Sequence, residues 1–364
     1  MTRPSLTIRA VRSTAVEVPM NHVLGTSRAA LRAAPLLLID VETEEGVTGH
    51  AYLFCYMRQA APAIAAMVAA IEELVKGTRV DPEGTWKTLE KRFTLIGVQG
   101  IVRMAMAGLD VACWDALARA SGKPLVQLLG AEARAIPAYN SNGLGLMPLA
   151  ALAKEADELL EGGFGGVKLR LGYPTLAEDL AAVHAVRGRL PQAVALMVDY
   201  NQALPVDEAL ERGRALDGEG IYWIEEPIRH DDYAGAARLA RELSTPIQIG
   251  ENFSQPYALE EALRQEACDY VMPDLERIGG VTGWMKAAKI AAERNVPMSS
   301  HLFPEASAHL LAASRTCHWL EYVDWAAPLL QEPARVEAGR VRPSAAPGLG
   351  LDWNPEAVER YRMK

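Results

Sequence analysis

Three carboxylic acids follow short apolar segments along the chain. They are Asp199 after ALMV, Glu225 after IYWI and Glu251 after IQIG. Together they would offer Mg²⁺ the hard oxygen ligands that this ion prefers, with positions left open for water or substrate. Zinc is not expected, because no histidine or cysteine lies among them at ligand spacing. The alternative is three separate surface ion pairs, which the repeated position after an apolar segment disfavours.

The end of an apolar segment holds a polar or charged residue seven times in succession. The full set is Lys168 and Arg170, Asp199 with Asn201, Glu225 with Glu226, Glu251 with Asn252, Asp274, His301, and Glu321. One aspartate in such a place is usually a turn residue or a helix cap. A series of this length is not explained by capping, and it indicates a common functional site.

The segments that carry these residues alternate with amphipathic helices. Strands are predicted at residues 166–171, 195–199, 222–225, 247–251, 270–273, 298–301 and 319–322, and helices at 176–189, 206–217, 233–243 and 282–294. This repeat predicts parallel strands with crossover helices, in enough units to close a (β/α)8 barrel whose C-terminal strand ends form one mouth. A doubly wound open sheet is the competing arrangement. It is disfavoured because no glycine-rich phosphate loop follows the first strand.

The first third of the chain has a different pattern. Strand signals at residues 6–18, 35–42 and 50–54 precede alanine-rich helical stretches at 60–75 and 102–121. Three strands followed by helices predict an α+β domain. The predicted division is residues 1–130 for this domain, 131–331 for the barrel, and 332–364 for a segment that packs back on the first domain.

Two pairs of side chains extend the predicted site. Lys168 and Arg170 are two residues apart on one strand, so they point to the same face. K-x-R alone is a weak signal that more often marks a solvated strand end. Asp274 and His301, on consecutive strands, could form a dyad in which the carboxylate fixes the imidazole tautomer and raises its basicity.

The composition limits the possible partners. The chain has 364 residues, of which 23% are charged, and a formal net charge of −9, which argues against binding to nucleic acid or anionic membranes. The four cysteines form no CxxC pair and are typical of a reducing cytosol. The N-terminus has no signal-peptide core, and no apolar run reaches the length of a membrane span. We therefore expect a cytoplasmic protein that acts on a small molecule.

Combined, the motifs resemble those of the enolase superfamily, and specifically its mandelate racemase group. They are VKLRLGYP, MVDYNQ, WIEEP, IGEN, MPDLERIGGVTGW, PMSSHLF, RMAMAGLDVACWDALA and APLLLIDVETEEGVTGHAYLF. The resemblance covers nearly the whole chain. It implies a modified TIM barrel with an N-terminal α+β capping domain, and a homo-oligomer.

The resemblance also implies a metal centre and a base. Asp199, Glu225 and Glu251 would be the Mg²⁺ ligands, and Asp274 with His301 would form the base dyad. The substrate would be a small-molecule carboxylate whose α-proton is removed to give a metal-stabilised enolate.

Four further residues receive roles from the same resemblance. Glu321 would hydrogen-bond the substrate carboxylate as a protonated electrophile, a state that a desolvated, anion-rich pocket favours. Lys168 would neutralise charge near that carboxylate. Ser141 and Asn201 would contact the substrate.

One position departs from the family pattern. Arg170 stands where mandelate racemase has the second lysine of K-x-K, which acts as the base on the opposite face. A guanidinium stays protonated at ordinary pH, so two-base racemisation is not expected by that route. The leading hypothesis is a lyase that dehydrates a hydroxylated (acid-sugar) carboxylic acid. The alternatives are an isomerase that racemises or epimerises a 2-hydroxy acid and, remotely, a non-catalytic binding protein.

A segment of the first domain, residues 20–32, is predicted to be a loop that covers the substrate. In mandelate racemase the corresponding loop is largely apolar, whereas here it contains Asn21, His22, Arg28 and Arg32. If these side chains point inward, they suit hydroxyl groups or a second carboxylate, and otherwise they are solvated loop residues. The candidate substrate contacts in this domain are His22, Arg28 and Tyr56.

Overall fold

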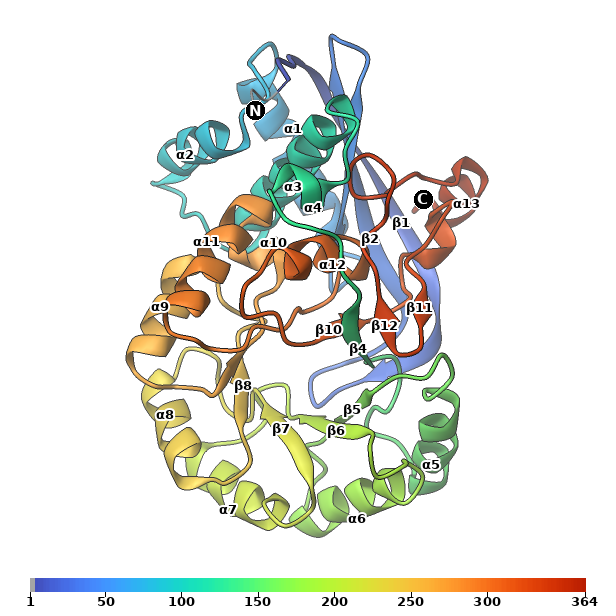
Figure 1. Cartoon of the computed structure of the whole chain (residues 1–364), viewed down its shortest axis with the longest axis vertical. Coiled ribbons are helices and arrows are strands. Elements are labelled where there is room, and N and C mark those ends of the chain that lie inside the picture. The colour runs from blue at the N-terminus through green and yellow to red at the C-terminus, as the bar shows by residue number, and fades with distance from the viewer. Residues whose placement is uncertain (1–3) are drawn as a thin grey trace.

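The computed structural model describes residues 4–364, so residues 1–3 of the predicted first domain lie outside the described part. A capping domain lies at one end of the molecule and a barrel at the other (Figure 1). The capping domain has a three-stranded antiparallel sheet in the order β1-β2-β3. Its elements are β1 (Ile8–Gly25), β2 (Ala30–Thr43), β3 (Thr48–Phe54), α1 (Ala60–Val75), α2 (Pro82–Phe93), α3 (Gly100–Ala120) and α4 (Leu125–Leu128).

The helix α3 joins the two parts of the molecule. It is buried along most of its length and packs on β3 on one side and on helices of the barrel on the other. Its approach to β3 requires glycine at position 49, because a Cβ there would lie 2.0 Å from the carbonyl oxygen of Ala112.

Replacing Gly49 with alanine is therefore expected to destabilise the protein by about 1–3 kcal/mol, the usual effect of overpacking a core. Chemical denaturation followed by circular dichroism measures the change. Gly218 is the matched control, because a Cβ there meets no atom within 4 Å. Equal stability of the two alanine variants would contradict this account of the β3–α3 contact.

Residues 20–32 are not the predicted loop. They form the tip of a long hairpin, in which β1 and β2 run further than predicted and a tight turn joins Thr26 to Ala29 (N–O 2.8 Å). The tip reaches the barrel (Figure 1). There the Ser27 hydroxyl donates to the carbonyl of Tyr200 at 3.2 Å. The capping sheet itself therefore covers one side of the barrel mouth.

The predicted barrel is confirmed. Parallel strands pair in the order β4-β5-β6-β7-β8-β9, and β10 returns to pair with β4. The strands are β4 (Ile136–Asn140), β5 (Gly166–Arg170), β6 (Ala195–Asp199), β7 (Ile221–Glu225), β8 (Ile247–Ile249), β9 (Tyr270–Val271) and β10 (Leu320–Tyr322). The helices are α5 (Leu149–Glu158), α6 (Leu176–Arg187), α7 (Val206–Leu216), α8 (Tyr233–Glu242), α9 (Pro256–Arg264), α10 (Leu275–Ile278), α11 (Gly280–Glu293) and α12 (Pro304–Ala312).

One predicted strand is absent as a regular element. Residues 298–301 make only isolated parallel bridges, from Met298 to Val271 and Cys317 and from His301 to Asp274. These bridges still close the gap between β9 and β10. The segment therefore takes the place of a strand, and the barrel is modified at this point.

Large side chains fill the barrel below its mouth. Tyr139 of β4, Met197 of β6 and Trp223 of β7 form a fully buried cluster in which the two aromatic rings meet edge to face at 5.4 Å. Because strand residues two apart share a face, Ser141, Asp199 and Glu225 stand directly above this cluster. The cluster, called the barrel floor below, supports the functional layer.

The C-terminal segment contacts both parts of the molecule. A hairpin of β11 (Val336–Glu337) and β12 (Arg340–Val341) pairs with β4, and α13 (Pro355–Tyr361) packs on β1 after the 3-10 helix η1 (Ala327–Leu329). The Trp353 indole donates to Asp40 of β2 at 2.8 Å. The segment after residue 331 thus packs on the capping domain, as predicted, but also pairs with the barrel, and the division at residues 130 and 331 stays a prediction.

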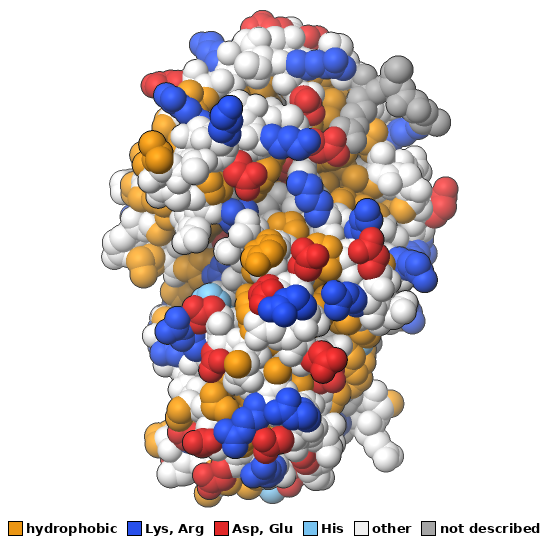
Figure 2. Space-filling view, turned by 90° about the vertical axis from the view of Figure 1, so that its left-hand side faces the viewer, with side chains coloured by type: hydrophobic (Ala, Val, Ile, Leu, Met, Phe, Trp, Pro, Cys, Tyr) orange, Lys and Arg blue, Asp and Glu red, His pale blue; other side chains and the backbone are white. Residues whose placement is uncertain are grey.

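The described surface has mixed charge. On the face shown in Figure 2, basic and acidic side chains are interspersed. Across residues 4–364, the helices include none that is both long and apolar enough to cross a membrane. The prediction that the chain binds no nucleic acid is not tested by these features.

Candidate active site and metal centre

The three predicted metal ligands converge at the barrel mouth. Asp199 ends β6, Glu225 ends β7 and Glu251 follows β8, and each offers a carboxylate oxygen within 4.8 Å of the other two. Asn201 holds Asp199 in place, because its backbone N–H and its side-chain amide donate to the two oxygens of that carboxylate, at 2.7 and 2.9 Å. Three clustered anionic oxygens fit the ligand preference of Mg²⁺.

Lys168 lies beneath this triad. Its Nζ is 2.7 Å from Glu225, 2.8 Å from Glu321 and 3.4 Å from Asp199. Burial opposes the charge of this lysine, but the three carboxylates raise its pKa above the usual range. Burial raises the pKa of Glu225 to about 8 despite the nearby lysine. The positive charge of Lys168 only partly balances the negative charge of the clustered carboxylates. A divalent cation would balance the rest.

Asn252, which belongs to the predicted series of polar residues, and Arg277, which does not, hold Glu251. The Asn252 side-chain amide donates to Glu251 at 3.1 Å and to the buried Glu226 at 2.6 Å. Arg277 donates to the backbone carbonyl of Glu251 at 3.2 Å and to the Asn252 side-chain oxygen. Glu226 and Asn252 belong to the predicted series and directly follow predicted ligands in the sequence, whereas no role was predicted for Arg277.

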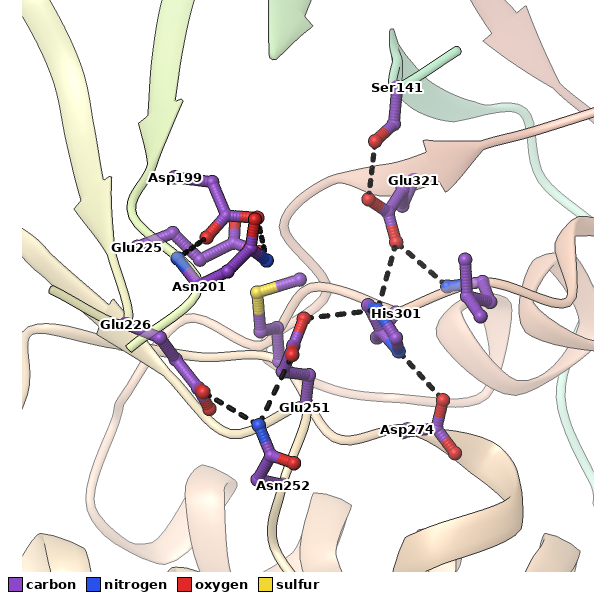
Figure 3. A network of polar contacts seen from close by, with 12 residues as sticks. Ser141, Asp199, Asn201, Glu225, Glu226, Glu251, Asn252, Asp274, His301 and Glu321 are labelled. Carbon is purple, nitrogen blue, oxygen red and sulfur yellow. Dashed lines mark hydrogen bonds and ion pairs between the residues drawn. The ribbon is translucent and has the colours of Figure 1, made fainter. Parts of the chain in front are cut away.

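His301 and Asp274 meet as a dyad (Figure 3). Asp274 caps α10 with one oxygen, which accepts the N–H groups of Glu276 and Arg277, and its other oxygen lies 2.7 Å from Nδ1 of His301. Nε2 of His301 is left facing Glu251 at 3.1 Å. Burial would lower the pKa of His301, but the surrounding carboxylates raise it well above the usual value.

The neighbours of Glu321 in this structure favour its ionised form, whereas its predicted role needs the protonated form. Its carboxylate accepts hydrogen bonds from the Ser141 hydroxyl at 2.6 Å and the Leu302 N–H at 2.8 Å, besides the contact with Lys168. Burial favours the protonated form, but Lys168 and His301 outweigh it and lower the pKa of Glu321 to about 2. The pocket is less anion-rich around this residue than the sequence indicated.

Hydrogen bonds to the protein engage the guanidinium of Arg170, so it is not available as a base. Its guanidinium donates to the carbonyls of Ser141 and Gly143 and to the Ser141 hydroxyl, each at 2.8 Å. The Ser141 hydroxyl therefore links Arg170 to Glu321, and its predicted contact with the substrate stays a prediction. It does not line the cavity described below.

Replacing Ser141 with alanine removes a hydrogen bond to each of two ionised groups. Such bonds contribute about 1.5–3 kcal/mol, so we expect turnover to fall about tenfold or more with little change in the circular dichroism spectrum. Ser121→Ala is the control, because that hydroxyl donates only to the Leu117 carbonyl in the capping domain. Normal turnover by the Ser141 variant would rule out this linking role.

A cavity of about 400 Å³ lies over these groups, between the barrel and the capping domain. Arg28, Tyr56 and Asn201 line it, as predicted for substrate contacts. His22 does not line it and lies instead beside Glu155, 3.6 Å away.

Two other polar residues of the hairpin also lie outside the cavity lining. Asn21 donates to Asp324 at 2.7 Å, and Arg32 is exposed to solvent. Of the four polar hairpin residues, only Arg28 faces the cavity, so the expectation that they point inward holds for one of them.

Family models match both parts of the chain. The model described as enolase C-terminal domain-like matches residues 151–357, and the mandelate racemase / muconate lactonizing enzyme N-terminal domain matches residues 8–130. Fold and site together define an enzyme of the enolase superfamily. The chain belongs to the mandelate racemase group of that superfamily.

Relatives with different activities share its full architecture. The L-talarate/galactarate dehydratase of Salmonella typhimurium is 32% identical over 339 residues, which cover 92% of this chain and 84% of the relative. The 3,6-anhydro-alpha-L-galactonate cycloisomerase of Streptomyces coelicolor is 31% identical over 98% of this chain and 99% of its own. A Bradyrhizobium enolase crystallised with magnesium and mandelic acid superimposes with a TM-score of 0.95 at 41% identity, covering 100% of both chains.

Proposed function

We propose that this protein is a Mg²⁺-dependent lyase that dehydrates a hydroxylated carboxylic acid of the acid-sugar class to a 2-keto acid. The observation that carries the proposal is one complete base dyad, Asp274 and His301, beside a carboxylate triad, with Arg170 bonded to backbone carbonyls on the other side. The dehydratase among the relatives supports the same reaction class.

The proposed reaction begins at His301. Mg²⁺ held by Glu251 would offset one of the carboxylates that raise the pKa of His301 and so favour the neutral imidazole. With Nδ1 engaged by Asp274, Nε2 of the neutral ring takes the α-proton of the substrate, and the C–H electron pair forms the enolate. When bound by Asp199, Glu225 and Glu251, Mg²⁺ supplies electrostatic stabilisation of the substrate carboxylate as negative charge develops on it. Lys168 adds a fixed positive charge to the same side of the site.

Elimination completes the reaction with one base. The enolate electrons form the Cα–Cβ double bond as the Cβ–O bond breaks, and the proton on His301 leaves with the departing hydroxide as water. The enol that remains tautomerises to the 2-keto acid. No second base on the opposite face is needed.

Screening acid sugars with Mg²⁺ tests the proposal directly. We expect 2-keto acid formation, detected by NMR and by a carbonyl reagent, from at least one member of a complete set of pentonic, hexonic and dicarboxylic acids. A parallel reaction without Mg²⁺ is the control. Failure of every acid to turn over would overturn the proposal.

Racemisation of a 2-hydroxy acid is the second candidate, favoured by the relative crystallised with mandelic acid. Incubation of mandelate in D₂O separates the two reactions. Exchange of the α-hydrogen with inversion indicates racemisation, whereas exchange without inversion indicates a single active base. The contacts of Arg170 lead us to expect no inversion.

We also propose that the enzyme is cytoplasmic and forms a homo-oligomer. Leu95 and Ile96 of the capping domain are 99% and 67% exposed, and burying such side chains between subunits is favourable. Light scattering on the purified protein measures its mass. A monomer at micromolar concentration would contradict the oligomer.

A further inference from the structure

A second cavity lies beside the one over the metal ligands. Its volume is about 470 Å³, and its walls come from the start of α3 in the capping domain and from the residues that follow β7 and β8 in the barrel. Arg277 and Asn252 line both cavities, so the two adjoin at these side chains. This space, called the side cavity below, has no role in the proposed reaction.

A buried cation, Arg103 of α3, lines the side cavity and is only 4% exposed. Its Nε and Nη2 both donate to one backbone carbonyl, that of Val98, at 3.1 and 2.8 Å. Its guanidinium also lies 5.6 Å from the ring centre of Trp86. Neither partner is charged, so the positive charge of Arg103 is not neutralised by these contacts.

The other buried arginine outside the active site, within the part of the chain that the structure describes, has counter-ions. Arg212 is 5% exposed and pairs with Asp179 at 2.6 Å and with Glu208 at 2.5 Å. Taking a cation out of water without such a partner is costly, and burial lowers the pKa of Arg103. An anion in the side cavity would reduce that cost.

The acidic side chains around the side cavity do not neutralise Arg103. Asp231 lines the cavity, but the guanidinium of Arg229 donates to both of its carboxylate oxygens. Glu90 lines a smaller cavity of about 250 Å³ that also includes Arg103, and this glutamate is exposed. Among residues 4–364, no carboxylate forms an ion pair with Arg103 within 4 Å. The position of a counter-ion is therefore open.

Neutral hydrogen-bonding groups lie beside this cation. Gln99 and Ser254 line both the side cavity and the smaller cavity, as Arg103 does. Their amide and hydroxyl groups can donate hydrogen bonds to an oxyanion. A guanidinium binds carboxylates and phosphates through parallel N–H bonds, and the bonds to Val98 leave Nη1 of Arg103 unused.

We infer that the side cavity binds a small oxyanion, a carboxylate or phosphate group of a small molecule, with Arg103 as its counter-ion. Gln99 and Ser254 would donate to the same group. This ligand is distinct from the substrate carboxylate, which the proposed reaction places at the metal ligands. The inference does not depend on the dehydratase function.

Calorimetric titration of the Mg²⁺-loaded enzyme with inorganic phosphate, and separately with malonate, tests the inference. We expect saturable binding of at least one of these anions with a Kd below about 10 mM. The two titrations show which oxyanion the cavity prefers. Arg103→Gln is expected to weaken that binding at least about tenfold, the effect of losing a charged hydrogen-bond donor. Circular dichroism checks that the variant is folded.

Arg187→Gln is the matched control. Arg187 also donates to backbone carbonyls, those of Leu190, Pro191 and Val194, but it lies outside the side cavity. This variant should bind the anion like the unaltered enzyme. Binding that is unchanged in the Arg103 variant would place the anion elsewhere and overturn the inference. No binding of either anion to the native assembly would overturn it as well.

A carboxylate built into the side cavity gives a second test. Ser254→Asp would supply the missing counter-ion from the protein itself, at a half-buried position. We expect the melting temperature to rise by about 1–3 °C, the scale of a partly buried ion pair. Anion affinity should fall at least about fivefold, because like charges repel. Ser254→Asn has the same shape without the charge and should produce neither effect.

Combining Ser254→Asp with Arg103→Gln isolates the pair. An aspartate at position 254 also lies close to the N-terminus of α9, where a negative charge is favourable, and that contribution would remain without Arg103. We expect the stabilisation by Ser254→Asp to fall by at least about half in the Arg103→Gln background. A rise in melting temperature that is independent of Arg103, or no rise in its presence, would contradict the counter-ion role.

Discussion

Replacing His301 with asparagine is expected to lower kcat/KM for dehydration by about 10²- to 10⁴-fold, the usual contribution of a general base. The asparagine amide can still donate to Asp274, so the local structure is expected to remain, but nothing is left to accept the α-proton. The decisive measurement is α-hydrogen exchange in D₂O, which reports proton abstraction even when elimination fails. We expect exchange to disappear together with turnover.

Two controls make this result specific. His184→Asn alters an exposed histidine that is paired with Glu219 on the outside of the barrel, and it should leave activity unchanged. Mg²⁺ binding by the His301 variant should remain measurable, since the carboxylate triad is intact. Retained exchange in the His301 variant would exclude this histidine as the base.

Removing Mg²⁺ with a chelator is expected to abolish turnover, and adding Mg²⁺ back should restore it. Glu225→Gln should raise the Kd for Mg²⁺ by at least about 100-fold, which exceeds the effect usual for a residue that only orients ligands. The amide would also leave Lys168 with one carboxylate fewer at close range. Calorimetric Mg²⁺ titration of both proteins measures the change.

Glu226→Gln is the matched control for the metal site. Glu226 is the neighbouring residue and is equally buried, but it contacts Asn252 and the Gly250 N–H and is not one of the clustered ligands. We expect about a tenfold effect from this second variant. An equal loss of Mg²⁺ affinity in the two variants would contradict the assignment of Glu225 as a ligand.

Much of the site could be predicted because the barrel strands are short apolar segments that end at a polar or charged residue. Asp199 and Glu225 follow apolar segments whose ends agree with β6 and β7, so parallel pairing alone brings them together. The segment at residues 298–301 was harder to predict. It begins after Pro297 and is followed by Leu302 and Phe303, both with left-handed backbones, so no regular ladder forms around His301.

The directions of the hairpin side chains could not be predicted. The pairing of β1 with β2 changes register between Pro19 and Leu24, so the alternation of inward and outward faces is not continuous through Asn21 and His22. The charge state of Glu321 was equally inaccessible. It depends on cations contributed by β5 and by the segment after β9, and their distances are fixed only by the closed barrel.

The barrel floor restricts how substrate enters the enzyme and how product leaves it. Tyr139, Met197 and Trp223 are fully buried and close the lower end of the barrel, so it offers no route to the metal ligands. The cavity over the metal ligands is lined by the hairpin tip and the end of β3, so substrate and product reach these ligands from the side of the capping domain. The rate at which they enter and leave on this side therefore sets an upper limit on turnover, however fast the proton transfer at His301.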